Sequence, residues 1–297
     1  MEKIINISVI IINYNTDKLT LQAVESVIKY TNNISYEIIV IDNCSPNGTN
    51  LATVLRAKPQ VEFYKLKENI GFGRANNYAY TKTKGEYIYL LNSDAYLIEN
   101  NIKEMYDYMK VHQNVASCGT KMLFECGKQN FSFGNFWTLK KMLDDSGWLK
   151  ISKEKREQKI STSRIVKFST PTSVDYISGA SVMFKKSIIE ILGFFDERFF
   201  MYYEDMELSY RFIKKGYKNI ILPRPRVVHI GGQSGLITKP NDAFLRKEVA
   251  KSKNLFIKIR YGFFVSVIVT VLDFNYKTWF YQNIKKIINI YSFYCRI

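Results

Sequence analysis

Cysteine is scarce in this chain of 297 residues, and no secretion signal is visible. The four cysteines form no Cys-x-x-Cys pair and no metal-ligand spacing, so we expect free thiols in a reducing compartment rather than a disulfide framework. The first residues enter a strand-like run at once, without an apolar stretch that ends in a cleavage site. We therefore expect a cytoplasmic protein.

A membrane-spanning run is also missing. The apolar stretch Tyr261–Leu272 would span about 18 Å as a helix, against a hydrocarbon core of about 30 Å. It lies within 244–297, where ten Lys or Arg and two acids give +8 of the chain's net charge of +16. We expect residues 241–297, including Trp279, to attach to an anionic membrane surface, on the inner face of the cell membrane. A C-terminal helix hairpin packed on the core is the alternative.

Acidic residues are outnumbered over the whole chain, which implies an anionic partner. The charge of +16 suits nucleic acid, an anionic membrane or a phosphorylated substrate. The positive charge is concentrated in an apolar segment and no nucleic-acid motif is visible, so no nucleic acid is expected. A basic nucleic-acid-binding protein remains the alternative outside enzymes.

Apolar strands alternate with amphipathic helices in the first part of the chain. We expect strands at 4–12, 37–41, 61–66 and 86–91, and helices at 17–30, 51–57 and 102–111. Such alternation predicts an α/β fold with a mainly parallel sheet, whose carboxyl edge binds a ligand. Further on we expect short strands at 217–222 and 226–229, after an irregular surface insertion, 128–172, of the kind that often recognises a variable substrate.

Several polar groups follow these strands. The loop Asn69–Asn77 holds two glycines whose backbone would admit a phosphate or sugar, although a tight turn into a helix explains them as well. A third glycine at the dinucleotide spacing is missing, which argues against a nicotinamide site. Asp94 would reach a divalent cation on a diphosphate, or cap the next turn. A lone His229 at a strand end is more often structural.

The stretch Gly193–Phe212 places five carboxylates among the densest aromatic residues of the chain. A spacing of four between Leu208 and Phe212 predicts a buried helix face that begins near Glu204. In an apolar pocket the pKa of a carboxylate rises toward that of a working base. A capped helix packed by aromatic residues is the alternative.

Seven segments together resemble the family 2 inverting glycosyltransferases, in order and in spacing. They are VIIINYN (9–15), IVIDNCS (39–45), NIGFGRANN (69–77), LLNSDAYL (90–97), ISGASVMF (177–184), GFFDERFFMYYEDMELSYR (193–211) and HIGGQS (229–234). The resemblance covers about residues 5–240 and is nearest to bacterial rhamnosyltransferase-like enzymes of O-antigen and surface polysaccharide synthesis.

The resemblance implies a GT-A fold, a single Rossmann-like α/β domain at 1–240 that binds a nucleotide-sugar. By position, Asp205 matches the catalytic base, and Asp94 and His229 match ligands of Mg²⁺ or Mn²⁺. Asn92 stands where the family's DxD motif has its first Asp, which lowers the anionic charge for the metal. The nucleotide-sugar residues implied are Asn13, Asn15, Asp42, Asn69, Gly71, Phe72, Asn76, Ser93, Gly179 and Glu204.

The implied activity is an inverting, metal-dependent sugar transfer to a lipid-linked saccharide acceptor. dTDP-rhamnose is the expected donor. A UDP-hexose or UDP-galactofuranose is the alternative donor. A retaining mechanism would need a second, nucleophilic carboxylate, which the motifs do not offer.

Overall fold

The computed structural model describes residues 4–46, 49–139, 169–231 and 243–271. The chain divides into two compact units, residues 1–136 with 164–252 and residues 137–163 with 253–297. The expected boundary after residue 240 lies within the first unit, because that unit includes the start of helix α9 (Ala243–Tyr261). Most of the insertion at 128–172, the loop after Gly231 and Trp279 lie outside the described residues.

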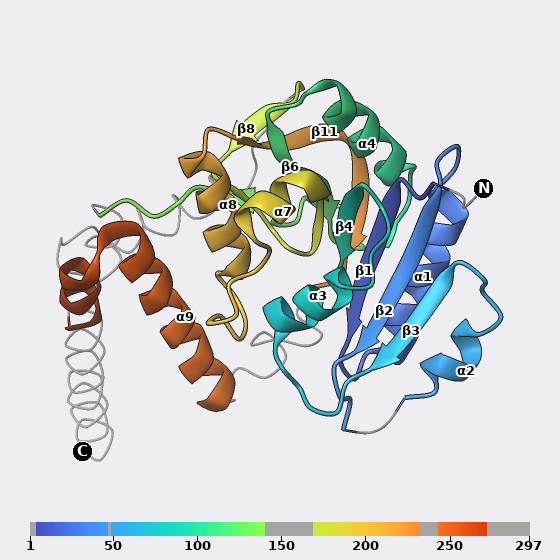
Figure 1. The fold of residues 1–297 in the computed structure, drawn as a ribbon, viewed down its shortest axis with the longest axis horizontal. Coiled ribbons are helices and arrows are strands. Elements are labelled where there is room, and N and C mark those ends of the chain that lie inside the picture. Colours follow the sequence, from blue (N-terminus) through green and yellow to red (C-terminus); the bar gives the residue numbers. More distant parts are fainter. Residues whose placement is uncertain (1–3, 47–48, 140–168, 232–242, 272–297) are drawn as a thin grey trace, which may run out of the picture. The chain divides into compact units, whose positions relative to one another are not determined.

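A nine-stranded sheet forms the centre of the first unit, in the order β3-β2-β1-β4-β10-β6-β11-β5, with β8 paired to β11 (Figure 1). Its strands are β1 (Ile7–Asn13), β2 (Tyr36–Asp42), β3 (Val61–Lys65), β4 (Tyr87–Leu91), β5 (Ala95–Leu97), β6 (Val115–Leu123), β8 (Thr172–Val174), β10 (Ser181–Lys185) and β11 (Lys218–His229). A separate two-stranded sheet joins β7 (Phe133–Gly134) to β9 (Tyr176–Ile177).

The predicted α/β fold is confirmed, with a mixed sheet. Strand β1 pairs in parallel with β2 and β4, as β2 does with β3. Strand β10 runs antiparallel to both β4 and β6, and β5 and β8 run antiparallel to β11. The register pairs Asn13 with Asp42, so two polar strand ends meet at the carboxyl edge.

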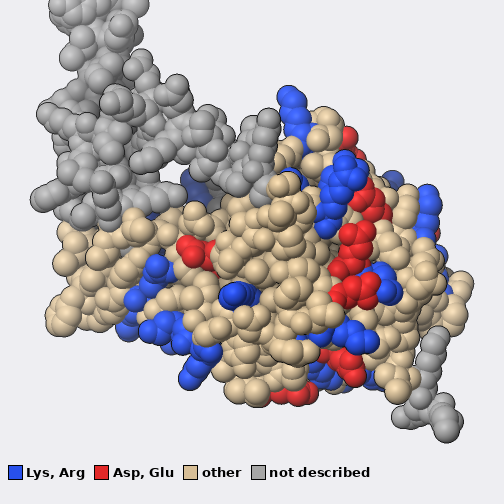
Figure 2. All heavy atoms as spheres, turned by 90° about the horizontal axis from the view of Figure 1, so that it is seen from above, with Lys and Arg blue, Asp and Glu red and all other residues tan. Residues whose placement is uncertain are grey.

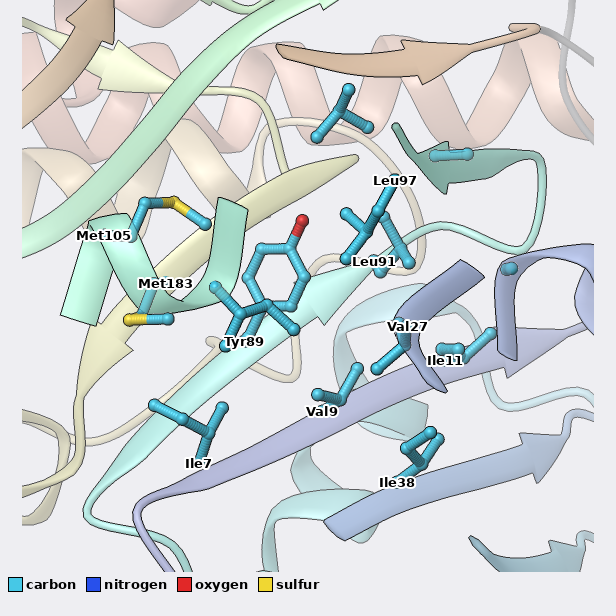
Figure 3. Packing of buried hydrophobic residues seen from close by; sticks show 14 of the residues in the cluster. Ile7, Val9, Ile11, Val27, Ile38, Tyr89, Leu91, Leu97, Met105 and Met183 are labelled. Atoms are coloured by element: carbon cyan, nitrogen blue, oxygen red, sulfur yellow. The ribbon is translucent and has the colours of Figure 1, made fainter. Parts of the chain in front are cut away.

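Helices cover both faces of the sheet, which is why β1 is apolar except at Ser8 and at its last residue, Asn13. They are α1 (Asp17–Tyr30), α2 (Leu51–Leu55), α3 (Phe72–Tyr80), α4 (Asn101–Val111), α7 (Lys186–Leu192) and α8 (Glu204–Lys214). On one face Ile7, Val9 and Ile11 pack with residues of α1 and α4 (Figure 3). On the other face Ile10 packs with residues of α3, α7 and α8.

The end of the sheet differs in detail from the prediction. The two short strands expected at 217–222 and 226–229 are one strand, β11, with a register irregularity between Leu222 and Arg226. Pro223 and Pro225 lie in this interval and carry no backbone N–H, so they cannot donate to the ladder there.

Arg211 fastens α8 to the loop that follows α7. Its guanidinium pairs with Glu207 at 2.8 Å and also donates to the carbonyls of Leu192, Gly193 and Phe194. The Glu207 side chain is only 5% exposed, so this ion pair is largely shielded from water. The contact holds the start of the acidic and aromatic stretch against the helix that contains Asp205.

Arg211→Lys should lower the free energy of unfolding by about 2–3 kcal/mol, because an ammonium cannot replace the planar guanidinium on a carboxylate and three carbonyls. Urea unfolding measures the change. Arg198→Lys is the matched control, since Arg198 pairs with Asp196 at a side-chain exposure of 64% and should contribute about 0–1 kcal/mol. Equal effects of the two substitutions would contradict the anchoring role of Arg211.

Candidate functional site

A pocket opens in the first unit beyond the carboxyl ends of β1, β2 and β4. Its lining residues are Ile12, Tyr14, Asn43, Asn69, Phe72, Asn92, Ser93, Asp94, Phe200, Met201, Phe244 and Leu245. Four of these, Asn69, Phe72, Ser93 and Asp94, are site residues expected from the sequence. The pocket therefore lies where open α/β sheets bind their ligands.

Asn13 and Asp42 lie behind the pocket rather than in its wall. Both side chains are fully buried, and Asn13 Nδ2 donates to Asp42 Oδ1 at 2.8 Å. The Ser45 hydroxyl donates to the same Asp42 oxygen at 2.5 Å and accepts from the amide of Asn15 at 2.8 Å. Asn15 itself is exposed in a left-handed conformation, φ 57°. Asn13 and Asp42 thus fix the turn that presents Asn15.

Gly71 allows the closest backbone approach at the site. It has φ +85°, and a Cβ there would lie 2.3 Å from the carbonyl oxygen of Phe200. That carbonyl accepts a hydrogen bond from the amide of Phe72 at 2.9 Å. Asn43, a pocket residue not expected from the sequence, donates to Asn69 at 3.0 Å and to the Gly71 carbonyl at 3.3 Å. The start of α3 is therefore fixed from two sides.

Asn76 and Ser93 have different places in the site. Asn76 is buried in α3, and its Nδ2 donates to the carbonyl of Phe72 at 2.9 Å, so it supports the helix. Ser93 lines the pocket and accepts a hydrogen bond from Thr16 at 2.9 Å.

Asp94 and His229 meet at the rim of the sheet, as the family resemblance implied. Asp94 Oδ1 and His229 Nε2 are 3.2 Å apart, and both side chains are largely buried. Two ligands at right angles on one ion, each at about 2.1 Å, are about 3 Å apart, so the pair fits a shared divalent cation. Within the described residues, no cluster of three or more His, Cys, Asp or Glu could hold a metal. Diphosphate oxygens and water would have to supply the other ligands.

Asp205 is held beside this edge by backbone amides. Its carboxylate accepts hydrogen bonds from Gly179 at 3.1 Å and Met206 at 2.8 Å. The carbonyl of Ala180, the residue after Gly179, accepts a hydrogen bond from the amide of Asn92 at 2.9 Å. This contact links Asp205 to the end of β4. Burial raises the pKa of Asp205, and these amides oppose the rise because they stabilise the ionised form.

Glu204 is more deeply enclosed than its neighbour. It is 5% exposed, and among the described residues none forms a hydrogen bond with its Oε2. Burial raises the pKa of Glu204 to about 8, and the charge of Asp205 adds to the rise. The two adjacent carboxyl groups therefore differ in environment, because backbone amides stabilise the ionised form of Asp205, whereas burial favours the neutral form of Glu204.

An unusual turn delivers these two acids, and the sequence did not reveal it. Tyr202 and Tyr203 have φ of 65° and 70°, although neither residue favours the left-handed region. Strained backbone of this kind gathers at functional sites. Glycine is the usual sequence signal of a left-handed turn, and no glycine stands just before the acidic pair.

Residues 8–192 match the family model described as glycosyl transferase family 2, which is more than half of the chain. The chain belongs to this glycosyltransferase family. The match includes the strand ends, the Gly71 loop and Asp94, and it ends before Glu204 and Asp205.

Two curated relatives of this glycosyltransferase are similar over shorter stretches. Poly(ribitol-phosphate) β-N-acetylglucosaminyltransferase TarP of Staphylococcus aureus is 33% identical over 107 residues, 35% of this chain and 33% of that protein. N-acetylglucosaminyl-diphospho-decaprenol L-rhamnosyltransferase of Mycobacterium tuberculosis is 38% identical over 56 residues, 19% of this chain and 18% of that protein. The chain therefore matches a third or less of the length of each.

Two solved structures are similar in fold to most of this chain. The crystal structure of GalNAc-T7 with UDP, GalNAc and Mn²⁺ has a TM-score of 0.61 at 18% identity and covers 88% of this chain and 51% of that one. Staphylococcus aureus TarS 1–349 has a TM-score of 0.54 at 17% identity, covering 85% and 64%. The predicted GT-A fold is confirmed.

Glu204→Gln should change the pH dependence of stability. The folded protein binds the Glu204 proton more tightly than the unfolded chain, so this residue lowers the wild-type stability as pH rises from about 5 to above 8. The variant has no such proton. The free energy of unfolding of the variant minus that of the wild type, measured with urea, should therefore be larger at high pH than at low pH. Glu197→Gln, which removes an exposed acid of the same segment, is the control. If Glu204→Gln changed the free energy of unfolding equally at low and at high pH, burial would not raise the pKa of Glu204.

Proposed function

We propose that this glycosyltransferase inverts the anomeric carbon of a nucleotide-sugar donor in one displacement, with Asp205 as the base. The observation that carries the proposal is the Asp205 carboxylate, half-buried and held by two amides beside the pocket edge. The acceptor oxygen bonds to the anomeric carbon, its proton passes to Asp205, and the bond from that carbon to the diphosphate oxygen breaks.

The donor would occupy the pocket at the carboxyl edge. Asn69, Phe72 and Ser93 line it, and Asn15 lies on the turn held by Asn13 and Asp42. Gly71 and Asn76 position the start of α3, Gly179 orients Asp205, and Glu204 adds a neutral acid. A divalent cation held by Asp94 and His229 would stabilise the charge of the departing nucleoside diphosphate.

Asp205→Asn should lower turnover at least about a hundredfold, the usual size of general-base catalysis, while donor binding changes only a few-fold. Steady-state rates of sugar transfer and equilibrium binding of the nucleoside diphosphate give the two quantities. Asp196→Asn, which removes an acid paired with Arg198, is the matched control. Near-normal turnover in Asp205→Asn would point to Glu204 or Asp196 as the base instead, and the Asp196→Asn variant distinguishes these two.

dTDP-rhamnose is the donor that we propose, and a lipid-linked saccharide of surface polysaccharide synthesis is the acceptor. The likeness to the mycobacterial L-rhamnosyltransferase supports this choice. The likeness to TarP supports UDP-N-acetylglucosamine as the alternative, and other UDP-hexoses and UDP-galactofuranose remain candidates.

A thermal unfolding screen with Mn²⁺ should show the largest shift with dTDP-rhamnose. A ligand at about a hundred times its dissociation constant stabilises by roughly 2.7 kcal/mol. EDTA, Asp94→Ala and His229→Ala should each reduce the shift, because the cation bridges protein and diphosphate. A larger shift with a UDP-sugar would make that sugar the donor in place of dTDP-rhamnose. A shift that EDTA does not change would contradict the proposed role of the cation.

Family membership leaves little support for a nucleic-acid-binding protein. On the face drawn in Figure 2, Lys and Arg lie in separate groups, some of them beside Asp or Glu, rather than in one continuous stripe. A protein that tracks phosphates gathers its positive charge on one path.

Attachment to an anionic membrane is supported by an apolar helical face in the second unit. Within the described ranges no helix has the length and hydrophobicity of a membrane span. Residues 263–271 are helical, and their exposed apolar side chains are Phe263 (58%), Phe264 (82%), Val267 (43%), Ile268 (55%) and Val271 (50%). Val265 and Val269 face a small cluster with Ile257 and Trp137 instead. Basic residues precede this face in α9, which suits an anionic interface.

Phe264→Ser combined with Ile268→Ser should weaken binding to phosphatidylglycerol vesicles at low salt, because both side chains would insert among the lipids. Vesicle cosedimentation measures this. Val111→Ser with Ile191→Ser removes two apolar side chains of similar exposure, 72% and 73%, from the first unit and should have no effect. Wild-type protein that ignores anionic vesicles would leave the helical face as an ordinary protein surface.

A further inference from the structure

Four aromatic side chains from three segments gather beside Asp205, within the first unit. The rings of Phe136 and Tyr176 stack with centroids 5.9 Å apart, and Tyr210 of α8 meets Phe136 edge-on at 5.7 Å. Phe131 lies 6.1 Å from Tyr176. We call Phe131, Phe136, Tyr176 and Tyr210 the aromatic platform. None of the four lines the donor pocket described above.

The platform is tied to both halves of the proposed reaction centre. Tyr176 lies in β9, three residues before Gly179, whose amide donates to Asp205 at 3.1 Å. At the other end Asn130, the neighbour of Phe131, donates from Nδ2 to the carbonyl of His229 at 2.8 Å. A molecule on the platform would therefore lie beside Asp205 on one side and beside the Asp94–His229 pair on the other.

Part of this platform is open to solvent, unlike a core cluster. Phe136 is 6% exposed and serves as its buried base, whereas Phe131 is 46% exposed. The Tyr176 hydroxyl fits over Gly134, where a Cβ would lie only 2.5 Å from it. Burial and the charge of Asp205 raise the pKa of Tyr176, so its hydroxyl keeps its proton and remains a donor.

We propose that Phe131 and Tyr176 bind the sugar ring of the acceptor, an inference that rests on the proposed transfer at Asp205. A pyranose presents an apolar face of C–H groups and a rim of hydroxyls. The Phe131 ring suits that face, and the Tyr176 hydroxyl suits one of the rim oxygens. The attacking hydroxyl of such a ring would then lie toward Asp205.

The surroundings favour a sugar over a lipid chain at this place. Asn130 directly precedes Phe131, and the exposed Asn135 directly precedes Phe136. A lipid chain needs a continuous apolar surface, whereas a saccharide uses amide and hydroxyl groups around a single aromatic ring. Phe131 also belongs to the insertion expected to recognise the variable substrate.

Saturation-transfer NMR with methyl glycosides of N-acetylglucosamine, glucose, galactose and rhamnose tests the binding without catalysis. At least one should bind the full-length wild-type protein, with the saturation on its ring C–H protons. Phe131→Ala should weaken that binding about tenfold and Tyr176→Phe about fivefold, as expected for losing one aromatic contact or one hydrogen bond. Phe131→Trp should retain it.

Phe124→Ala is the matched control, because Phe124 has a similar exposure of 41% outside the platform and should leave glycoside binding unchanged. In the transfer assay the platform variants should raise the KM for the same glycoside and keep the rate of donor hydrolysis by water. Glycoside binding that is absent in the wild type, or unchanged in both Phe131→Ala and Tyr176→Phe, would overturn the proposal. Glycoside binding as expected, together with near-normal transfer in Asp205→Asn, would instead contradict the function proposed for Asp205.

Discussion

The close approach of two backbone segments at Gly71 organises the site. Because Gly71 has no side chain, the Phe200 carbonyl reaches the amide of Phe72 at 2.9 Å. This contact brings Phe200 and Phe72 into one pocket wall, although they are far apart in sequence. It also fixes one end of the short segment that leads to Asp205. Arg211 fixes the other end through carbonyls 192–194.

Tyr202 and Tyr203 lie between Phe200, which this contact fixes, and α8, which Arg211 ties to the loop after α7, so the chain has few residues in which to turn into the helix. A conformation that costs about 1–3 kcal/mol per residue persists only where the surroundings determine it. This turn leads into the start of α8, which places two acids in different environments. Glu204 enters the protein interior, and Asp205 is met by amides at the site edge.

This difference between the acids bears on how a diphosphate can be accommodated. A second ionised carboxylate next to Asp205 would add to the repulsion of the donor, whereas burial favours the neutral form of Glu204. Separation of two carboxyl groups by environment is a general way to give them different roles. Asn92, in place of an acid, lowers the negative charge of the same region further.

The sequence determined the early strands, the helices between them and the family, because hydrophobic periodicity and strand-end polar residues are local properties. Through the resemblance it also matched Asp94 and His229 to cation ligands, and the two side chains lie 3.2 Å apart. Only the tertiary structure decided that β10 enters the sheet antiparallel, that Asn13 and Asp42 are buried behind the pocket, and that Phe131 reaches Tyr176. These features depend on contacts between segments far apart in the chain, and such contacts leave no periodic pattern in either segment.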